Sequence, residues 1–167
     1  MALATAALAA TAASAAARPA VIAACTTGQL QTWLGTPGSG AAGSTYYELE
    51  LSNVSTTTCS LTGYPVVLAV SGAGAALGSP AAHDTAYPPV TVKLAPGGTA
   101  HAVLRVTDTG VLPSCSPVTA AGLQIFPPTR AHALSLPFGF SACSSAGPSY
   151  LHIRVIHPGP GIPGRSQ

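Results

Sequence analysis

The stretch Cys59-Ser-Leu-Thr-Gly-Tyr-Pro-Val-Val-Leu-Ala-Val70 indicates how the chain folds. Gly63 can adopt a positive φ, while Pro65 fixes its own φ and favours an extended Tyr64, so these three residues predict a structural corner. The aliphatic run 66–70 then predicts a strand buried on one or both faces. Tyr64 offers a large ring for packing, and its hydroxyl can bond to the backbone, as a corner tyrosine does in sandwich domains. The stretch predicts structure but no biochemical activity.

Alternating apolar and polar residues predict further strands. The clearest lies at 44–53, where a tyrosine and two leucines face inward while Glu48 and Glu50 face outward onto a solvated surface. Residues 35–40, rich in glycine and proline, are predicted to form a loop. Further strands are expected in 25–34 and at 90–94, 99–107, 122–127, 132–136 and 150–157. About seven to eight strands with no amphipathic helix predict an all-β, Ig-like or Greek-key β-sandwich, with a closed barrel as the alternative.

The chain of 167 residues is long enough for one domain with its own core, expected at 25–157. Residues 1–24 are alanine-rich and carry an A-x-A pattern before Arg18, which is typical of a leader or an atypical signal segment. Residues 158–167 are rich in proline and glycine and are expected to be a disordered tail.

Charged residues make up only 6% of the chain, against roughly 25% in an average soluble domain. The net charge of +2 and the single lysine, Lys93, leave no basic patch that could grip phosphates, so we expect no nucleic-acid partner. Mean hydropathy is high, at +0.43. After Arg18, however, no stretch is continuously apolar for the roughly 20 residues that a membrane helix needs, so the mature domain is expected to have no membrane span.

Four cysteines lie far apart, and their spacing fits neither a zinc ribbon nor a thioredoxin-like motif. Their even number favours two disulfides in an oxidising compartment over four free thiols in a cytosolic protein. Of the three possible pairings we predict Cys25–Cys59, which would pin the N-terminal edge beside the corner, and Cys115–Cys143, which would close the other half. Residues 22–25 also resemble a lipoprotein cleavage box, but a lipid on Cys25 would leave one cysteine without a partner.

Motifs for catalysis are missing from the sequence. It has no G-x-S-x-G elbow and no glycine-rich phosphate loop, and its only aspartates are Asp84 and Asp108. Glu48 and Glu50 could suggest paired carboxylates, but acids on an alternating strand are far more often a solvated face. We therefore predict no catalytic residue and no cofactor.

Five histidines in a chain with so few charges invite a metal hypothesis. His101, His132 and His152 could converge from neighbouring strands to bind copper or zinc. No two histidines have the i, i+2 spacing that places two ligands on one strand face, and methionine occurs only as Met1. Surface histidines without a ligand are the favoured interpretation, and no metal site is predicted.

Four segments together carry a family resemblance: Cys59–Pro65, Leu94–His101, Cys115–Val118 and Leu123–Pro128. With them the chain resembles an actinobacterial family of secreted or lipid-anchored proteins known as the domain of unknown function number 4232. The resemblance covers about residues 25–157, and it implies an extracytoplasmic β-sandwich without implying an activity, a cofactor or a catalytic residue.

These observations lead to one hypothesis and one alternative. The hypothesis is a non-enzymatic envelope or extracellular module that presents a surface to a protein, glycan or peptidoglycan partner. The alternative is a secreted metal-handling protein that uses His101, His132 and His152.

Overall fold

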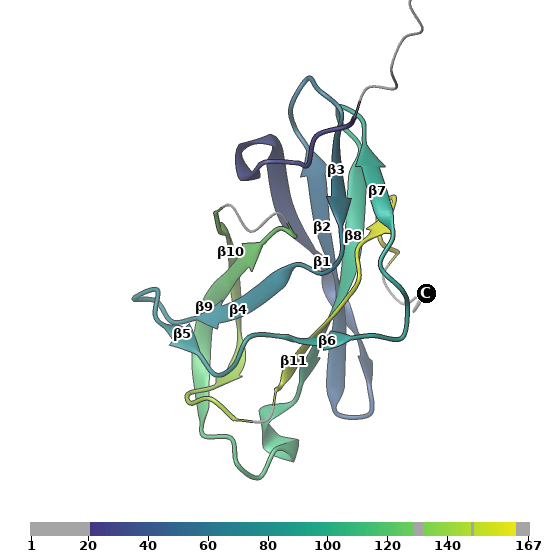
Figure 1. Cartoon of the computed structure of the whole chain (residues 1–167). Coiled ribbons are helices and arrows are strands. Elements are labelled where there is room, and N and C mark those ends of the chain that lie inside the picture. Colours follow the sequence, from purple (N-terminus) through teal and green to yellow (C-terminus); the bar gives the residue numbers. More distant parts are fainter. Residues whose placement is uncertain (1–20, 129–131, 148, 163–167) are drawn as a thin grey trace, which may run out of the picture.

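The computed structural model describes residues 21–128, 132–147 and 149–162, and nearly all of its regular structure is β-strand (Figure 1). Along the chain the elements are η1 (Thr27–Gln29), β1 (Leu30–Ala41), β2 (Ser44–Asn53), β3 (Cys59–Thr62), β4 (Val66–Val70), β5 (Ala76–Leu77), β6 (Ala82–Asp84), β7 (Thr91–Leu94), β8 (Thr99–Thr107), η2 (Thr109–Val111), β9 (Pro117–Phe126), β10 (Leu134–Cys143), β11 (Leu151–Arg154) and β12 (His157–Pro158). In the described ranges no helix is long and apolar enough to cross a membrane. The all-β prediction is confirmed.

Hydrogen bonds arrange the strands in three sheets. The largest has the order β1-β2-β8-β11-β6, and β12 also pairs with β8; the second has the order β10-β9-β4-β5; β3 and β7 form a two-stranded sheet. In Figure 1 the sheet of β9 and β10 lies beside that of β2 and β8, and the β3–β7 pair lies at the upper end. Within the described residues no strand pairing joins the two larger sheets, so the structure is a sandwich and not the closed barrel.

The predicted corner is the point where the chain changes sheets. Residues 59–70 are divided into β3, which pairs with β7, and β4, which pairs with β9. Between them Gly63 has φ 101°, a backbone conformation that glycine adopts without steric cost. Pro65 is buried and cannot donate to a ladder, which suits the break between the two strands.

The core lies between the inward faces of the two larger sheets. Alternate residues of each strand point to this space, because successive side chains of a strand face opposite sides. The fully buried residues on these faces include Leu49, Leu51, Leu104, Leu151 and Ile153 from the first sheet and Val67, Ala69, Leu123 and Ile125 from the second. Burial of each leucine, isoleucine or valine side chain contributes about 1.5–3 kcal/mol to folding.

Segment boundaries differ from the sequence prediction in several places, and three of the differences concern segments that were not expected to form strands. The predicted loop 35–40 belongs to β1, which pairs with β2 on both sides of an irregularity between Gly35 and Ser39. At the N-terminus, Ala23 and Ala24 already run alongside Ser60 of β3, although they were expected to belong to the leader. The other residues of that leader, 1–20, lie outside the described part.

The third difference concerns the expected disordered tail. Its first residues, 158–162, are placed against the large sheet, with Pro158 opposite Ala100 of β8. Backbone pairing and contacts with buried side chains of β2 and β8 hold this segment, so its proline and glycine content does not keep it out of the fold. Residues 163–167 lie outside the described part.

Candidate functional site

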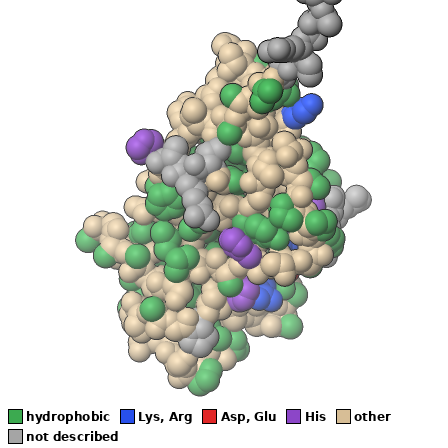
Figure 2. Space-filling view, viewed as in Figure 1, with side chains coloured by type: hydrophobic (Ala, Val, Ile, Leu, Met, Phe, Trp, Pro, Cys, Tyr) green, Lys and Arg blue, Asp and Glu red, His purple; other side chains and the backbone are tan. Residues whose placement is uncertain are grey.

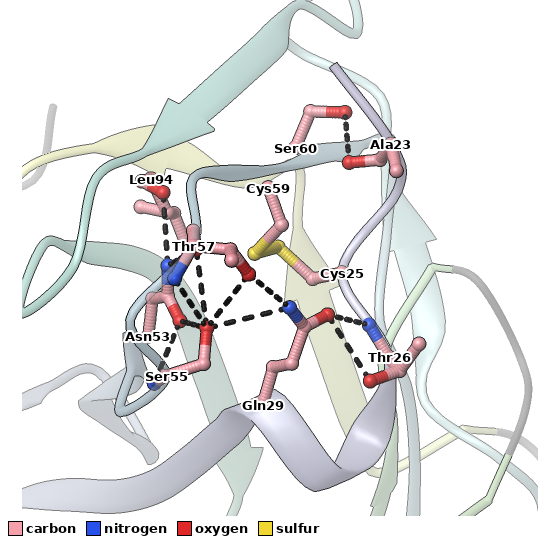
Figure 3. The surroundings of a disulfide bond; sticks show 10 residues. All are labelled: Ala23, Cys25, Thr26, Gln29, Asn53, Ser55, Thr57, Cys59, Ser60 and Leu94. Carbon is pink, nitrogen blue, oxygen red and sulfur yellow. Dashed lines mark hydrogen bonds between the residues drawn. A yellow bond between two sulfur atoms is a disulfide. The ribbon is translucent and has the colours of Figure 1, made fainter.

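Both disulfides join the cysteines that the sequence predicts. The first links Cys25 to Cys59 with a Cα–Cα distance of 4.8 Å, and the second links Cys115 to Cys143 at 5.2 Å. Figure 3 shows the first, where the chain before η1 runs along β3. There the Cys25 N–H donates to the Ser60 carbonyl at 2.9 Å. The first bridge therefore attaches the N-terminal segment to β3, and the second joins the segment just before β9 to the end of β10.

A buried asparagine organises the loop beside the first disulfide (Figure 3). The Asn53 side-chain amide donates to the carbonyls of Thr57 at 2.8 Å and Leu94 at 3.0 Å. Its carbonyl accepts from the Ser55 N–H at 3.0 Å and the Ser55 hydroxyl at 2.7 Å. Since every polar atom of this fully buried amide has a partner, its role is structural.

The corner tyrosine is less enclosed than the sequence predicts. The ring of Tyr64 is half-buried and stacks on His83 with 4.3 Å between ring centroids, and its hydroxyl donates to the Tyr87 carbonyl at 3.3 Å. The tyrosine that is buried in the core is Tyr150, which is 1% exposed and donates to the Leu77 carbonyl at 2.9 Å. Burial raises the pKa of Tyr150 to about 12.

The three histidines of the metal alternative do not converge. His101 and His152 lie on the outer face of the large sheet, but His152 is opposite Arg105 and the ring of His101 stacks on His157, at 5.9 Å between centroids. His132 is exposed before β10, where its backbone bonds to the Thr27 hydroxyl. In the part of the chain that the structure describes, no group of three or more His, Cys, Asp or Glu side chains could hold a metal ion.

The outer face of the large sheet instead carries a charged cluster, made of Glu48, Glu50, Asp84, His101, Arg105, His152, Arg154 and His157. Glu50 lies opposite His101 of β8, and Arg154 of β11 forms an ion pair with Asp84 of β6, with 3.2 Å between Nε and Oδ2. The cluster therefore holds three of the chain's four acidic residues.

The expectation that Glu48 and Glu50 face solvent is wrong. They are 5% and 1% exposed, because the chain after β12 crosses over them. The backbone N–H of Gly161 donates to Glu50 Oε1 at 2.8 Å. Figure 2 shows histidine and Lys or Arg side chains among hydrophobic and uncharged ones on one face, and no Asp or Glu is visible among the coloured residues there.

Burial shifts the pKa values of several groups in the cluster. It raises the pKa of Glu48, and the nearby charges of His101 and Arg154 offset this increase only in part. Burial also raises the pKa of Glu50, against the hydrogen bond from Gly161. For His157, burial followed by the charges of His101 and Arg154 lowers the pKa. Both glutamic acids therefore hold a proton at higher pH than exposed ones do.

A cleft of about 380 Å³ opens at one end of the sandwich, between the turn that joins β1 to β2, the end of β8 and strand β10. Its lining combines hydroxyl groups with two aromatic rings: Gly40, Ala41, Gly43, Ser44, Thr45, Tyr47, Val106, Thr107, Asp108, Thr109, Phe140 and Ser141. The hydroxyls of Thr109 and Ser141 lie 2.7 Å apart, and those of Ser44 and Thr107 lie 3.5 Å apart. Asp108 caps η2 by accepting the Gly110 N–H at 2.9 Å.

Sequence reasoning missed both the burial of the acid pair and the cleft. Strand alternation correctly places Glu48 and Glu50 on the face away from the core, but it does not say what covers that face. The available signal was that two of only four acids in the chain lie at the centre of one strand, among tyrosines and leucines. The hydroxyls of the cleft gave no signal, because serine and threonine are common throughout the chain.

Comparison with known proteins gives one family match. Residues 25–155 match the profile of a family described as a domain of unknown function, DUF4232. No curated protein and no solved structure matches the chain significantly.

Proposed function

The chain belongs to the DUF4232 family, and from that premise we propose that it is an extracytoplasmic module that binds a glycan and does not turn over a substrate. The cleft at the end of the sandwich carries the proposal. Its setting would be the one that the family resemblance suggests, the envelope or surroundings of an actinobacterial cell.

The cysteines support the extracytoplasmic part. Cys25, Cys59 and Cys143 are buried in disulfides, and such bridges persist in oxidising compartments. A sulfur that is bonded to another sulfur cannot also carry a thioether lipid, so the Cys25–Cys59 bridge favours a secreted or otherwise attached protein over a lipid anchor at Cys25. Export by the expected leader, residues 1–24, is part of the proposal.

The lining of the cleft supports the glycan. A sugar presents hydroxyl groups at its edges and C–H groups on its faces, so it is complemented by hydroxyls beside aromatic rings. Ser44, Thr107 and Ser141 supply the hydroxyls, while Tyr47 and Phe140 supply rings. A volume of about 380 Å³ lies within the range of roughly 300–1,000 Å³ that ligand sites occupy.

The same lining supports binding over catalysis. Asp108 is the only carboxylate among the described residues that line the cleft, and none of them is a histidine, cysteine or lysine. Hydrolysis of a glycoside generally requires a pair of carboxyl groups, and nucleophilic chemistry requires an activated side chain. A site of this composition holds a sugar through hydrogen bonds and ring contacts.

Titration with soluble oligosaccharides and peptidoglycan fragments, followed by amide chemical shifts in NMR spectra, tests the proposal. We expect shifts at Ser44, Thr107 and Ser141, and about fivefold weaker binding by Ser141→Ala, the effect of one neutral hydrogen bond of about 1 kcal/mol. Thr62→Val is the matched control, since its hydroxyl bonds to Thr91 at 2.9 Å on the β3–β7 sheet, outside the cleft.

Two outcomes would overturn the proposal. One is the absence of shifts with every glycan; the other is shifts that map away from the cleft and are unchanged in Ser141→Ala. A parallel copper and zinc titration addresses the alternative, because a stoichiometric metal site that is lost in His152→Ala would favour metal handling.

A further inference from the structure

The last described segment, residues 157–162, forms a C-terminal strap across the outer face of the large sheet. His157 and Pro158 pair with His101 and Ala100 of β8, and the Gly159 N–H donates to the Thr99 carbonyl at 3.0 Å. At Gly159 the backbone takes φ 81°, and by Gly161 it has reached the glutamic acids of β2. The strap is thus the element that separates Glu48 and Glu50 from water.

The strap fits closely over these two acids. A Cβ at Gly161 would lie 2.8 Å from both Cβ and Cδ of Glu48, so no other residue fits there without displacing the strap or the acid. Two hydrogen bonds tie the strap to side chains beneath it. The Gly161 N–H donates to Glu50 Oε1 at 2.8 Å, and the Gly159 carbonyl lies 2.8 Å from His101 Nδ1.

Covering the acids leaves polar atoms without partners. Oε2 of Glu48 and Oε2 of Glu50 are both buried, and neither has a hydrogen-bond partner among the described residues. Burying an ionised carboxylate that lacks a hydrogen-bond donor costs more free energy than burying the protonated carboxyl, because burial penalises the charge. With the strap removed, water would reach both groups and the ionised form would no longer carry this extra cost.

We propose that the C-terminal strap is a proton-operated latch, which closes over Glu48 and Glu50 as this pair takes up a proton and opens as the pair releases it to solvent. Opening would expose the outer face of β2 and β8, with its acid pair next to Trp33 of β1, which lies opposite Glu50. This regulation is independent of the proposed glycan site, since it concerns a different face of the molecule.

The charged groups around the pair set the pH range of the latch. The charged groups on the same face of the sheet are His101 and Arg105 of β8, His152 and Arg154 of β11, His157 of β12 and Asp84 of β6. The charge of His101 favours the ionised form of both glutamic acids and that of Arg154 favours ionised Glu48, whereas the charge of Glu48 favours a proton on Glu50. His157, the first residue of the strap, opposes closure at low pH, because its partial burial in the closed state disfavours its charged form.

The linkage has a defined sign. Both glutamic acids have raised pKa values in the closed state, so the closed state binds more protons than the open one above the ordinary carboxyl pKa of about 4.3. The ratio of closed to open molecules therefore falls as pH rises through that window, by up to tenfold per pH unit for each proton released.

Amide hydrogen exchange at Gly161, corrected for the intrinsic effect of pH, measures the latch in the full chain. We expect protection of this amide to fall as pH rises above the ordinary carboxyl pKa of about 4.3 in the wild type, and to depend much less on pH in Glu48→Gln and Glu50→Gln. Asp108→Asn, which removes an acid at the cleft, is the matched control and should keep the wild-type slope. Protection at Leu104 of β8 reports whether each variant is folded.

A second measurement keeps the test decisive. The side-chain carboxyl ¹³C shifts of Glu48 and Glu50 should titrate above the ordinary range in the wild type and return towards about 4.3 in Gly161→Ala, whose strap is displaced. The proposal is overturned if both carboxyls titrate normally in the wild type, or if Gly161 protection has the same pH slope in Glu48→Gln and Glu50→Gln as in the wild type.

Discussion

Two tyrosines of this domain differ in how far water reaches their rings. Tyr64 follows the corner glycine and stacks on the exposed His83, whereas Tyr150 precedes β11 and lies in the core. Gly78, with φ 69°, makes room for Tyr150, since a Cβ there would lie 2.6 Å from Cε1 of the ring. The contribution of each tyrosine to stability should follow its burial and not its position beside a turn.

Truncation of the two rings should therefore have unequal effects. Tyr150→Ala is expected to lower the free energy of unfolding by about 3–5 kcal/mol, because it leaves a large cavity and an unpaired Leu77 carbonyl. Tyr64→Ala should cost about 1–2 kcal/mol, since its half-buried ring can be replaced by water. Urea unfolding at constant pH measures both, and equal losses would contradict this assignment.

Single elements are shaped by close approaches that local sequence preference does not reveal. Strand β1 continues through a segment rich in glycine and proline because β2 offers it a hydrogen-bonding edge. At Gly38 a Cβ would lie 2.7 Å from Cγ2 of Thr45 and 2.8 Å from Cδ1 of Tyr47. The glycine that predicts a loop is thus what allows the strand to lie against its neighbour.

A pair of substitutions in β1 checks this interpretation. Gly38→Ala should destabilise the domain by about 1–3 kcal/mol, the usual cost of overpacking. Gly40→Ala, in the same strand, would place a methyl group where no atom lies within 4 Å, so its effect should stay within about 0.5 kcal/mol. Thermal unfolding that shifts equally in both variants would show that the close approach at Gly38 is unimportant.

The C-terminal strap also leads to a prediction about how the stability of the domain depends on pH. Burial, then the charges of His101 and Arg154, lower the pKa of His157, so the unfolded chain binds this proton more tightly than the folded protein does. The stability contributed by neutral His157 is therefore complete above about pH 6.5 and is lost as pH falls through the folded pKa.

His157→Gln should accordingly remove this contribution, so that the unfolding free energy of the variant relative to the wild type increases from pH 7 to pH 5. His132→Gln, at an exposed histidine away from the strap, is the matched control variant. Chemical denaturation at half-unit pH steps measures these profiles. Identical pH slopes for wild type and His157→Gln would refute the prediction.

At the scale of the whole molecule, the two disulfides lie at separate points of the sandwich. One ties the N-terminal segment to the small β3–β7 sheet, and the other ties the segment just before β9 to the end of β10 in the second large sheet. Their sequence separations are 34 and 28 residues, so on the chain-entropy model each is worth about 3–4 kcal/mol. A domain of ordinary stability, about 5–15 kcal/mol, is left marginal without one of them.

Replacing either pair with serines should thus lower the free energy of unfolding by about 3–4 kcal/mol, and reducing both bridges should unfold much of the population at 37 °C. Non-reducing peptide mapping of protein from its native host should recover Cys25 with Cys59 and Cys115 with Cys143. Any other pairing, or four free thiols, would contradict both the connectivity and the proposed compartment.

Local patterns were sufficient to predict the all-β class, although not to distinguish a sandwich from a closed barrel. Period-2 alternation predicts β2, the aliphatic run predicts β4, and the Gly63–Pro65 corner predicts the break before it, because each depends on the steric preferences of adjacent residues. Four well-separated cysteines with no metal-binding spacing likewise indicated two disulfides. What these patterns leave open is which sheet each strand joins, and the corner proved to be a change of sheet.

Only the tertiary structure decided the environment of the acid pair. Alternation assigns Glu48 and Glu50 to the face away from the core, but whether that face meets water depends on a segment 111 residues away, where Gly161 bonds to Glu50. The cleft is also formed by residues that are distant in sequence. The hydroxyls of Thr109 and Ser141, for example, are 32 residues apart in sequence and 2.7 Å apart in space. The burial of a side chain and the charges near it depend on all the segments that surround it in space. A short stretch of sequence therefore cannot predict either one.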